Sequence, residues 1–390
     1  MSAHVVIVGG GPAGLLTALG LVKEGSSVTV IEATTELNDS PRALVYHHPV
    51  LPYLDDLGIL DECIAEGFVK QDFSWHVHST GEMIRWSMTC LNDVAKHPYS
   101  LHLHQGLLSG IAARKLREYA KADIRLATRC VGCTEHDQGV SVEVEGPSGR
   151  ETIECDFVVA VDGATSFIRK EVLGLNFFGI TWPNRYIATN TRIDLAELGY
   201  CNTTMQIDDE YGAVICRIDD TALWRVTFME DPSLPEEQIP ERIHAKFEKH
   251  LPDIPYELVD FAPYRMHQRV TDRMRVGRIL LVGDSSHVTN PTGGLGLTGG
   301  MFDSFALVGA LNRVIHDGAS HDMLEFYERD RRRIFIEITS PRASDNLRRL
   351  YYLQPGQQKD DAVEWLREVS RSEDRMRNEF RFTEQMETHF

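Results

Sequence analysis

The chain opens on Val5-Val6-Ile7-Val8-Gly9-Gly10-Gly11-Pro12-Ala13-Gly14, an apolar run that feeds a glycine turn. The surrounding residues predict a βαβ unit: a strand over 4–8, a helix over 12–24 with its leucines on one face, and a strand over 28–31. In such a unit the first glycine permits a tight turn, the second admits a pyrophosphate and the third lets the helix pack closely on the sheet. This stretch therefore predicts a Rossmann-like, dinucleotide-binding fold.

Glu32 supports the same interpretation. It ends the second strand eighteen residues after Gly14, where a carboxylate can accept hydrogen bonds from the hydroxyls of an adenosine ribose. The helix that starts at Pro12 offers unpaired N–H groups and a partial positive charge to phosphates. These features do not distinguish FAD from NAD.

Two further stretches follow buried runs later in the chain. Asp162-Gly163-Ala164-Thr165-Ser166-Phe167-Ile168-Arg169 follows the apolar residues 157–161, and Gly283-Asp284-Ser285-Ser286-His287 follows Ile279-Leu280-Leu281-Val282. In this order and with these gaps, the three stretches resemble the FAD-dependent aromatic hydroxylases, the single-component flavoprotein monooxygenases typified by p-hydroxybenzoate hydroxylase.

The resemblance implies a set of cofactor contacts. It places Asp162 near the pyrophosphate, Asp284 on the ribityl chain, Pro291 beside the flavin ring and the N–H groups of Leu297 and Thr298 at its pyrimidine edge. Arg42 and Gln105 also match positions that contact FAD. The implied cofactor-binding residues are Gly9, Gly11, Pro12, Ala13, Gly14, Glu32, Arg42, Gln105, Asp162, Asp284, Pro291, Gly296, Leu297 and Thr298.

The chain also departs from the family pattern. Ser285-Ser286 replaces the usual pair of alanines, and Phe302-Asp303 replaces the usual acidic–Asp pair. The extra C-terminal thioredoxin-like domain of the phenol hydroxylases is missing, which indicates the smaller members of the family.

The resemblance also implies the chemistry. There is one dinucleotide fingerprint, so a second, stable nicotinamide domain is not expected. The resemblance implies FAD that is bound tightly and non-covalently, with NAD(P)H as a transient co-substrate. O₂ would then react through a flavin C4a-hydroperoxide, which hydroxylates an activated aromatic or N-heteroaromatic ring of the phenol or hydroxypyridine type. The identity of the ring, the choice between NADH and NADPH, and any loss of a ring substituent stay open.

Three residues are candidates for work on the substrate. His47 lies on a segment that in the family runs past the substrate pocket, and a neutral imidazole there could accept the ring hydroxyl proton. Tyr211 and Arg217 lie in the predicted antiparallel sheet, whose face would cover the flavin, and could orient a hydroxyl and a carboxylate respectively. His47 favours N-heteroaromatic substrates.

The pattern of elements predicts an α/β fold in three parts. Residues 1–75, 98–183 and 265–350 would form a discontinuous FAD-binding domain, and 76–97 with 184–264 an α+β substrate-binding domain of antiparallel sheet. Strands are expected near 187–193, 203–208, 213–218 and 223–229, with a helix near 235–250, long helices near 299–316 and 322–348, and a helical tail over 351–390. We expect the tail to pack on the surface or at a subunit contact, which leaves open whether the protein is a homodimer.

Composition indicates which partners and which cellular location to expect. With 390 residues and a net charge of −18, the chain lacks the basic surface that nucleic-acid binding requires. No apolar stretch reaches the roughly 20 residues that span a bilayer, and no signal-peptide core is present, which predicts a cytoplasmic protein without a membrane partner. Seven scattered cysteines, including Cys130 and Cys133, indicate structural thiols rather than a disulfide framework or a metal site.

Two other functional classes are compatible with this fold. One is a different FAD enzyme on this fold, such as a double-bond reductase or a halogenase, although the WxWxIP segment of halogenases is missing. The other is a non-catalytic relative that binds a partner protein, in which FAD-binding residues would be lost; here Glu32, Asp162 and Asp284 are all present.

Overall fold

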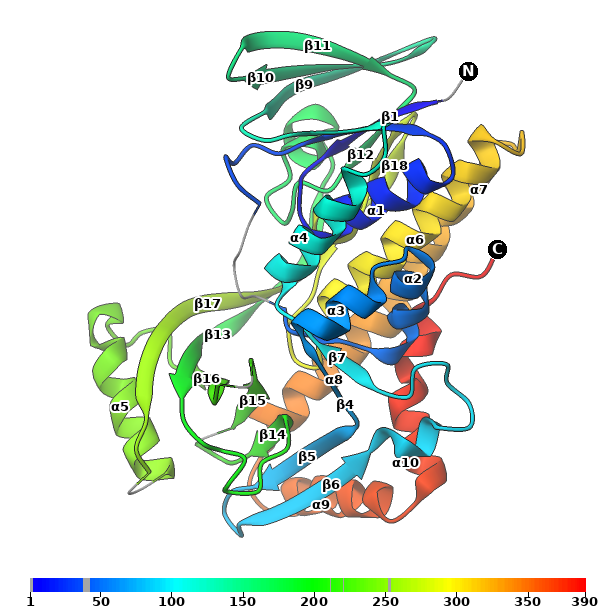
Figure 1. Ribbon diagram of the computed structural model, residues 1–390. Helices are drawn as coiled ribbons and strands as arrows, with labels where there is room; N and C mark the ends of the chain where they lie inside the picture. The colour runs from blue at the N-terminus through cyan, green and yellow to red at the C-terminus, as the bar shows by residue number, and fades with distance from the viewer. Residues whose placement is uncertain (1–2, 38–42, 211, 220, 252–253) are drawn as a thin grey trace.

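The computed structural model describes residues 3–37, 43–210, 212–219, 221–251 and 254–390 (Figure 1). Two predicted site residues, Arg42 and Tyr211, lie outside these ranges. The architecture is mixed α/β, as predicted.

A six-stranded sheet carries the glycine turn. Its order is β18-β19-β12-β1-β2-β8, and every neighbouring pair is parallel except β18 with β19. The strands are β1 (His4–Val8), β2 (Ser27–Ile31), β8 (Ala122–Arg125), β12 (Phe157–Ala160), β18 (Arg275–Val276) and β19 (Ile279–Leu281). Because the strands are parallel, the loops that follow β1, β12 and β19 emerge at the same edge.

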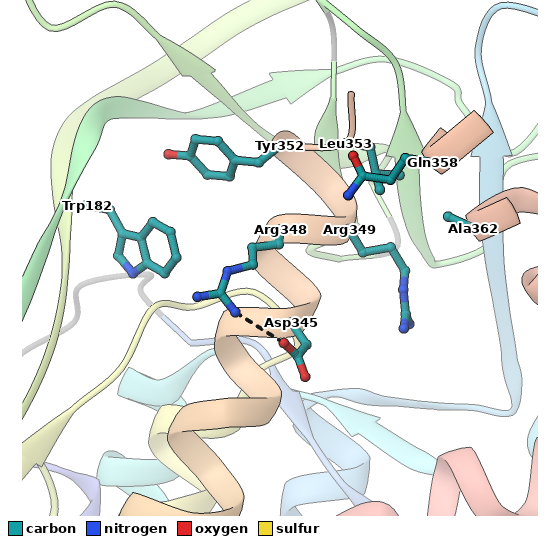
Figure 2. Close-up of a pocket in the computed structure, with 8 residues that line it drawn as sticks. All are labelled: Trp182, Asp345, Arg348, Arg349, Tyr352, Leu353, Gln358 and Ala362. Carbon is teal, nitrogen blue, oxygen red and sulfur yellow. Dashed lines mark hydrogen bonds and ion pairs between the residues drawn. The ribbon is translucent and has the colours of Figure 1, made fainter. Parts of the chain in front are cut away.

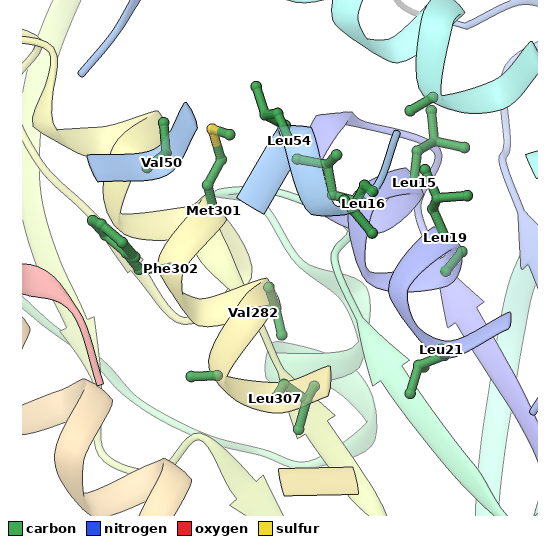
Figure 3. Packing of buried hydrophobic residues seen from close by; sticks show 14 of the residues in the cluster. Leu15, Leu16, Leu19, Leu21, Val50, Leu54, Val282, Met301, Phe302 and Leu307 are labelled. Carbon is green, nitrogen blue, oxygen red and sulfur yellow. The ribbon is translucent and has the colours of Figure 1, made fainter. Parts of the chain in front are cut away.

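Strand β1 contributes to two cores because its side chains alternate between the faces of the sheet. Val5 and Ile7 pack with Leu15 and Leu19 of helix α1 (Pro12–Lys23), in the large core that Figure 3 shows with helix α6 (Leu295–Ile315). Val6 and Val8 instead pack against a three-stranded sheet on the other face. That sheet consists of β9 (Arg129–His136), β10 (Gly139–Gly146) and β11 (Gly149–Cys155). Burial of each leucine side chain stabilises the folded state by about 1.5–3 kcal/mol. The alternation of apolar side chains along β1 therefore determines that both faces of the sheet are covered.

An eight-stranded sheet forms the second large body, lower in Figure 1. One face packs against helix α5 (Ile239–His250), preceded by the 3₁₀ turn η4 (Glu236–Gln238), and the other against helices of the C-terminal region. In sheet order its strands are β20 (His287–Val288), β17 (Glu257–Thr271), β13 (Phe177–Arg192), β16 (Leu223–Glu230), β15 (Ala213–Arg217), β14 (Thr203–Ile207), β5 (Asp72–Val77) and β6 (Glu82–Ser87).

Two long strands differ from the prediction. β13 begins at Phe177, before the expected boundary at 184, and β17, which was not predicted, continues to Thr271, beyond 264. Their outer ends pair with each other, Phe177 opposite Thr271, so the sheet extends past the predicted limits. Pro263 is unusual in a strand and made β17 hard to predict, because proline has no N–H to donate to a neighbouring strand. Among the described residues, β17 pairs at this position with β13 on one side only, so the missing N–H can face away from the sheet.

A small three-stranded sheet connects the two bodies. Its order is β3 (Val45–Tyr46), β7 (Ser100–His102) and β4 (Phe68–Lys70), all antiparallel. The helical elements around it are η1 (His48–Val50), α2 (Leu51–Asp56), α3 (Leu60–Glu66), η2 (Met88–Leu91) and α4 (Gln105–Leu116).

The long helix predicted over 322–348 is divided. It consists of α7 (Asp322–Ile334), a π turn (Phe335–Thr339) and α8 (Ser340–Tyr351). Pro341 explains the division, because proline has no N–H for the regular ladder and its ring displaces the preceding carbonyl. Another π turn of the same length, η3 (Ile168–Val172), follows β12.

The tail folds back on the molecule. Helices α9 (Gln357–Ser370) and α10 (Glu373–Arg381) and the turn η7 (Phe382–Met386) follow α8, and α9 lies along β5 and β6. Trp86 donates to the Leu366 carbonyl at 3.3 Å, and Met386 is buried in the large core. The tail is therefore part of the folded unit. None of the helices in the described ranges combines the length and apolarity that crossing a membrane would need.

Candidate functional site

The glycine turn after β1 is as tight as predicted. Gly9 has φ +120°, and a Cβ there would overlap the Val161 carbonyl of the neighbouring strand end. A Cβ on Gly14 would overlap the Gly9 carbonyl, so this position holds α1 close to the sheet. Gly11, the N-cap of α1, differs: apart from its chain neighbours, no atom of the described residues lies within 4 Å of the position that a Cβ would take. Bare backbone therefore faces open space at a helix N-terminus, an environment suited to a phosphate.

Glu32 lies beside this turn, directly after β2. Its Oε2 accepts from the Gly10 N–H at 2.8 Å, and its Oε1 accepts from the N–H and hydroxyl of Thr34 at 2.9 and 2.8 Å. These bonds hold the carboxylate at the strand end. Because a carboxylate has about four acceptor positions, Glu32 retains acceptor capacity for a ribose hydroxyl.

One side chain joins the second motif, which begins at Asp162, to the third, which begins at Gly283. Arg169, which is buried, donates to the Ser285 carbonyl at 2.7 Å and to the Ala164 carbonyl at 2.7 Å. Asp162 accepts from the Ile168 N–H at 3.1 Å through Oδ2, while its buried Oδ1 has no hydrogen-bond partner among the described residues. A buried acceptor without a donor is uncommon in proteins, and here it fits a ligand that brings one.

The third motif forms the 3₁₀ turn η5 (Gly283–Ser285) after β19 and exposes the side chain of Asp284. A Cβ on Gly283 would lie 3.7 Å from the Cβ of Ala13, and Ser304 of α6 donates to the Ala13 carbonyl at 3.0 Å. The first and third motifs, about 270 residues apart, are therefore in contact around the start of α1.

Helix α6 begins at the glycine loop predicted to meet the flavin ring. Pro291 is exposed, and its carbonyl accepts from the Gly294 N–H at 3.0 Å. Gly296, Leu297 and Thr298 lie in the first turn of α6, where backbone N–H groups have no partner within the helix. This turn can present donors to an electron-rich ring edge.

Gln105 is the first residue of α4 and lies next to the segment that follows Arg42. Its Oε1 accepts from the Ala43 N–H at 3.3 Å, and its own N–H donates to the Ala43 carbonyl at 3.2 Å. The position of Arg42 itself falls outside the described residues.

His47 contacts the same glycine loop. Its Nε2 lies 2.9 Å from the Gly293 carbonyl. Burial is the main reason that its pKa is lowered to about 4, although the Gly293 carbonyl acts in the opposite direction. The imidazole is therefore neutral near pH 7. Since a carbonyl can only accept, Nε2 carries the proton and Nδ1 is left as a proton acceptor.

Arg217 has no hydrogen bond to His47 among the described residues, and its guanidinium lies 5.9 Å from the ring of Phe68 on β4. It ends β15, pairs in register with Trp224, and its Nε donates to the Asp219 carbonyl at 2.7 Å. Because Trp224 lies in the core beside α5, the register places Arg217 on that same face of the sheet. Its neighbour Cys216 points to the opposite face, which the strand pattern alone could not establish.

Sequence reasoning missed two buried charges. Lys70 lies on β4 and Asp303 on α6, with 6% and 0% of their surfaces exposed. Nothing in the local pattern indicated that Lys70 is buried. Asp303 did carry a signal, because it keeps the aspartate of the family's acidic–Asp pair, in which Phe302 replaces the first acid. Asp303 accepts from Arg331 at 2.6 Å and from the Gly283 N–H at 2.9 Å. The second bond attaches the third motif to helix α6.

A cavity of about 490 Å³ lies elsewhere, against α8 (Figure 2). Its lining includes Trp182, Tyr352 and Arg349, with Arg348 in an ion pair to Asp345 at 3.4 Å. No residue of the three motifs lines it, so we place the candidate site at the glycine loops.

Cys130 and Cys133 lie at the start of β9 with their Sγ atoms 3.6 Å apart, as free thiols. Among the residues with described positions, no group of three or more His, Cys, Asp or Glu side chains is arranged to hold a metal ion.

The model of one protein family, described as FAD binding domain, matches residues 2–340. The chain belongs to this family. It is 57% identical over 389 residues to the 6-hydroxy-3-succinoylpyridine 3-monooxygenase of Pseudomonas putida (strain DSM 28022 / S16), covering 100% of this chain and 99% of that one. It is 39% identical over 367 residues to the para-nitrophenol 4-monooxygenase of Pseudomonas sp. (strain WBC-3), covering 92% of this chain and 90% of that relative.

A solved structure agrees with these matches. The crystal structure of p-nitrophenol 4-monooxygenase from Pseudomonas putida DLL-E4 aligns with a TM-score of 0.94 and 36% identity, covering 100% of this chain and 99% of that chain. Together the matches confirm the predicted family of FAD-dependent aromatic monooxygenases, the fold class and FAD as the cofactor. The bare backbone at Gly11 and the unpartnered Oδ1 of Asp162 fit that cofactor.

Proposed function

We propose that this enzyme hydroxylates an activated aromatic ring, with hydroxypyridines as the favoured class, using FAD, NAD(P)H and O₂. The observation that carries the proposal is the 57% identity, over the full length of both chains, to a monooxygenase that acts on a hydroxypyridine. When bound, FAD accepts hydride from NAD(P)H and activates O₂. All other contributions come from residues of this chain.

The three motifs bind and orient the cofactor in this proposal. The open backbone at Gly11 would receive the pyrophosphate and Glu32 the ribose, Asp284 would accept from the ribityl chain, and the unpartnered Oδ1 of Asp162 would accept from a donor of the cofactor near the pyrophosphate. The first turn of α6 at Leu297 and Thr298 supplies fixed N–H donors, which stabilise negative charge without reorganisation. Gly9, Pro12, Ala13, Gly14, Gln105, Pro291 and Gly296 shape the surrounding backbone, and Arg42 belongs to the proposed set by resemblance.

His47 is proposed as the residue that takes the ring hydroxyl proton. Its support is geometric: Nε2 is held by the Gly293 carbonyl at 2.9 Å on the loop before α6, which leaves Nδ1 as the acceptor. An electron-rich ring is a better nucleophile once its hydroxyl has lost the proton. Tyr211 and Arg217 stay proposed substrate contacts by resemblance, and Arg217 is the weaker of the two because it is bonded to Asp219.

The test is NADH and NADPH oxidation by the purified protein, with oxygen uptake followed in parallel. Hydroxypyridines, hydroxybenzoates and nitrophenols are added one at a time, and products are identified by mass. We expect a yellow protein whose oxidation rate rises with a hydroxypyridine and whose product has gained one oxygen atom. A yellow protein that no ring stimulates would favour a reductase, and a colourless protein would favour the binding relative.

Three further expectations belong to this proposal. The first is the division into a discontinuous FAD-binding domain, a substrate-binding sheet domain and a C-terminal tail. The others are a homodimer, tested by light scattering coupled to gel filtration, and a cytoplasmic location, tested by fractionation.

A further inference from the structure

Lys70 is a buried cation that the proposed mechanism does not use. Its side chain is 6% exposed, and among the residues with described positions its ammonium forms no ion pair or hydrogen bond. The Phe73 ring lies 5.7 Å from the ammonium, a cation–π contact that offsets only part of the cost of removing the charge from water. Burying an unpaired charge is costly. A lysine kept in such a place indicates that an anion binds beside it.

The register of the small sheet places Lys70 near His47. Lys70 pairs with Ser100 of β7, and Val45 pairs with His102. His47 is extended, with φ −73° and ψ 150°, so it continues the alternation of β3 and lies in the row of Ser100. His47 and Lys70 therefore flank β7 on one face, about 10 Å apart at two strand spacings. That span suits a substituted aromatic ring.

The same face points toward the eight-stranded sheet. His102, which shares it, lies 3.2 Å from the Arg217 carbonyl through Nδ1 and 3.4 Å from the Thr203 hydroxyl through Nε2. Thr203 pairs with Cys216, and Cys216 with Arg225, so these side chains line the opposing wall. Substrate between the walls would have His47 and the glycine loop at one end and Lys70 at the other.

The charges around Lys70 leave its ammonium unneutralised. Burial lowers the pKa of Lys70 to about 8, while Cys216, Asp72 and Cys201 raise it slightly. Asp72 accepts instead from Asn202, at 3.2 and 3.4 Å. The lysine in turn lowers the pKa of both His47 and His102, and burial contributes more to each shift. Neutral histidines do not repel the lysine or compete for an anion.

We propose that the Lys70 ammonium binds a carboxylate carried by the aromatic substrate on the side of the ring away from His47, and thereby selects acidic rings over neutral ones. This inference rests on the proposed function, since it identifies the class of ring. A single ammonium suits one carboxylate as a point charge.

The test compares Lys70→Met with Lys96→Met, whose lysine is exposed and pairs with Asp55 on the surface. The probes are 6-hydroxy-3-succinoylpyridine and its methyl ester, which lacks the negative charge. Binding to the FAD-loaded protein is followed by the flavin spectrum, and turnover by coupled product formation. We expect Lys70→Met to raise Kd and KM for the acid by about 10- to 100-fold, as for a lost charge-assisted hydrogen bond. For the ester, the change should stay below about threefold.

The inference is overturned if Lys70→Met, with normal flavin content and melting temperature, binds the acid as tightly as the wild type does. Should that variant fail to fold, the wild-type protein decides: equal affinity for acid and ester also overturns it. The proposed function fails separately, if the wild type hydroxylates no ring at all. In that case the binding comparison on the same protein still answers the question about Lys70.

A pH series separates anion binding from a structural role. Because the pKa of Lys70 is lowered to about 8, its charge is present below that pH and lost above it. Wild-type affinity for the acid should therefore fall as the pH rises through about 8 and beyond, since a bound carboxylate holds the proton longer. The affinity of Lys70→Met should not follow this profile, and an unchanged profile in the variant would contradict the inference.

Discussion

Replacing Asp303 by asparagine tests whether the buried charge network supports the third motif. Asp303 is fully buried and accepts from Arg331 Nε at 2.6 Å and from the Gly283 N–H at 2.9 Å, with His287 Nε2 at 2.8 Å. Arg331 also donates to the Met386 carbonyl at 2.6 Å, so the network connects the tail to the motif. Asparagine keeps the shape but removes the charge and one acceptor.

The expected cost follows from what Asp303→Asn leaves behind. Arg331, 1% exposed, loses its carboxylate, and breaking a buried pair costs about 3–5 kcal/mol. Arg331 keeps its bonds to Met386 and Gly299, so we expect the lower end, about 3 kcal/mol. With an unfolding entropy of about 2.1 cal/mol/K per residue, a chain of this length should melt about 4 °C lower.

Thermal unfolding followed by circular dichroism measures this shift. Asp345→Asn is the matched control, because its ion pair with Arg348 is largely exposed and should contribute less than about 1 kcal/mol. Adding Arg331→Met to Asp303→Asn should recover part of the loss, since no charge is then left unpaired. A melting temperature for Asp303→Asn within about 1 °C of the wild type would refute the reasoning.

The pH dependence of stability gives an independent check. Burial alone would raise the pKa of Asp303, but His287 and Arg331 outweigh it and hold the pKa at about 2, below the unfolded value near 3.9. The resulting stabilisation, about 3 kcal/mol, is present above pH 4 and lost as the pH falls toward 2. Asp303→Asn should remove this part of the acid destabilisation, and a variant that follows the wild-type acid profile would contradict the assignment.

Three other predictions concern the site. Gly11→Ala should fold normally, since Gly11 has φ −73° and open space, yet lower FAD affinity about tenfold or more; Gly14→Ala should instead destabilise the protein itself by about 1–3 kcal/mol through overlap with Gly9. FAD titration of each apoprotein and its melting temperature separate the two. Asp284→Ala should purify with less flavin, and a full complement of flavin would rule out its proposed role. His47→Ala should keep its flavin but lower coupled hydroxylation about 100-fold; unchanged turnover would remove His47 from the site.

The sequence by itself determined the nucleotide-binding edge of the molecule. The turn at Gly9, the packing at Gly14 and the position of Glu32 depend on backbone conformation and on residues close in the chain, so a short motif specifies them. The resemblance carried by the three motifs also implied that they would meet around one cofactor, and the parallel strands bring the following loops to one edge. The family matches confirm that interpretation.

Only the tertiary structure decided which charges are buried and what they face. Lys70 shares a row with His47 through the register of β4 on β7, although Lys70 lies on β4 and His47 directly after β3, more than 20 residues earlier in the chain. Arg217 and Cys216 lie on opposite faces of the eight-stranded sheet, because they are adjacent residues of one strand. Asp303 meets Arg331 through the packing of α6 on α7. Register and helix packing arise from contacts between distant segments, and the desolvation that gives these charges their properties exists only once those segments have packed.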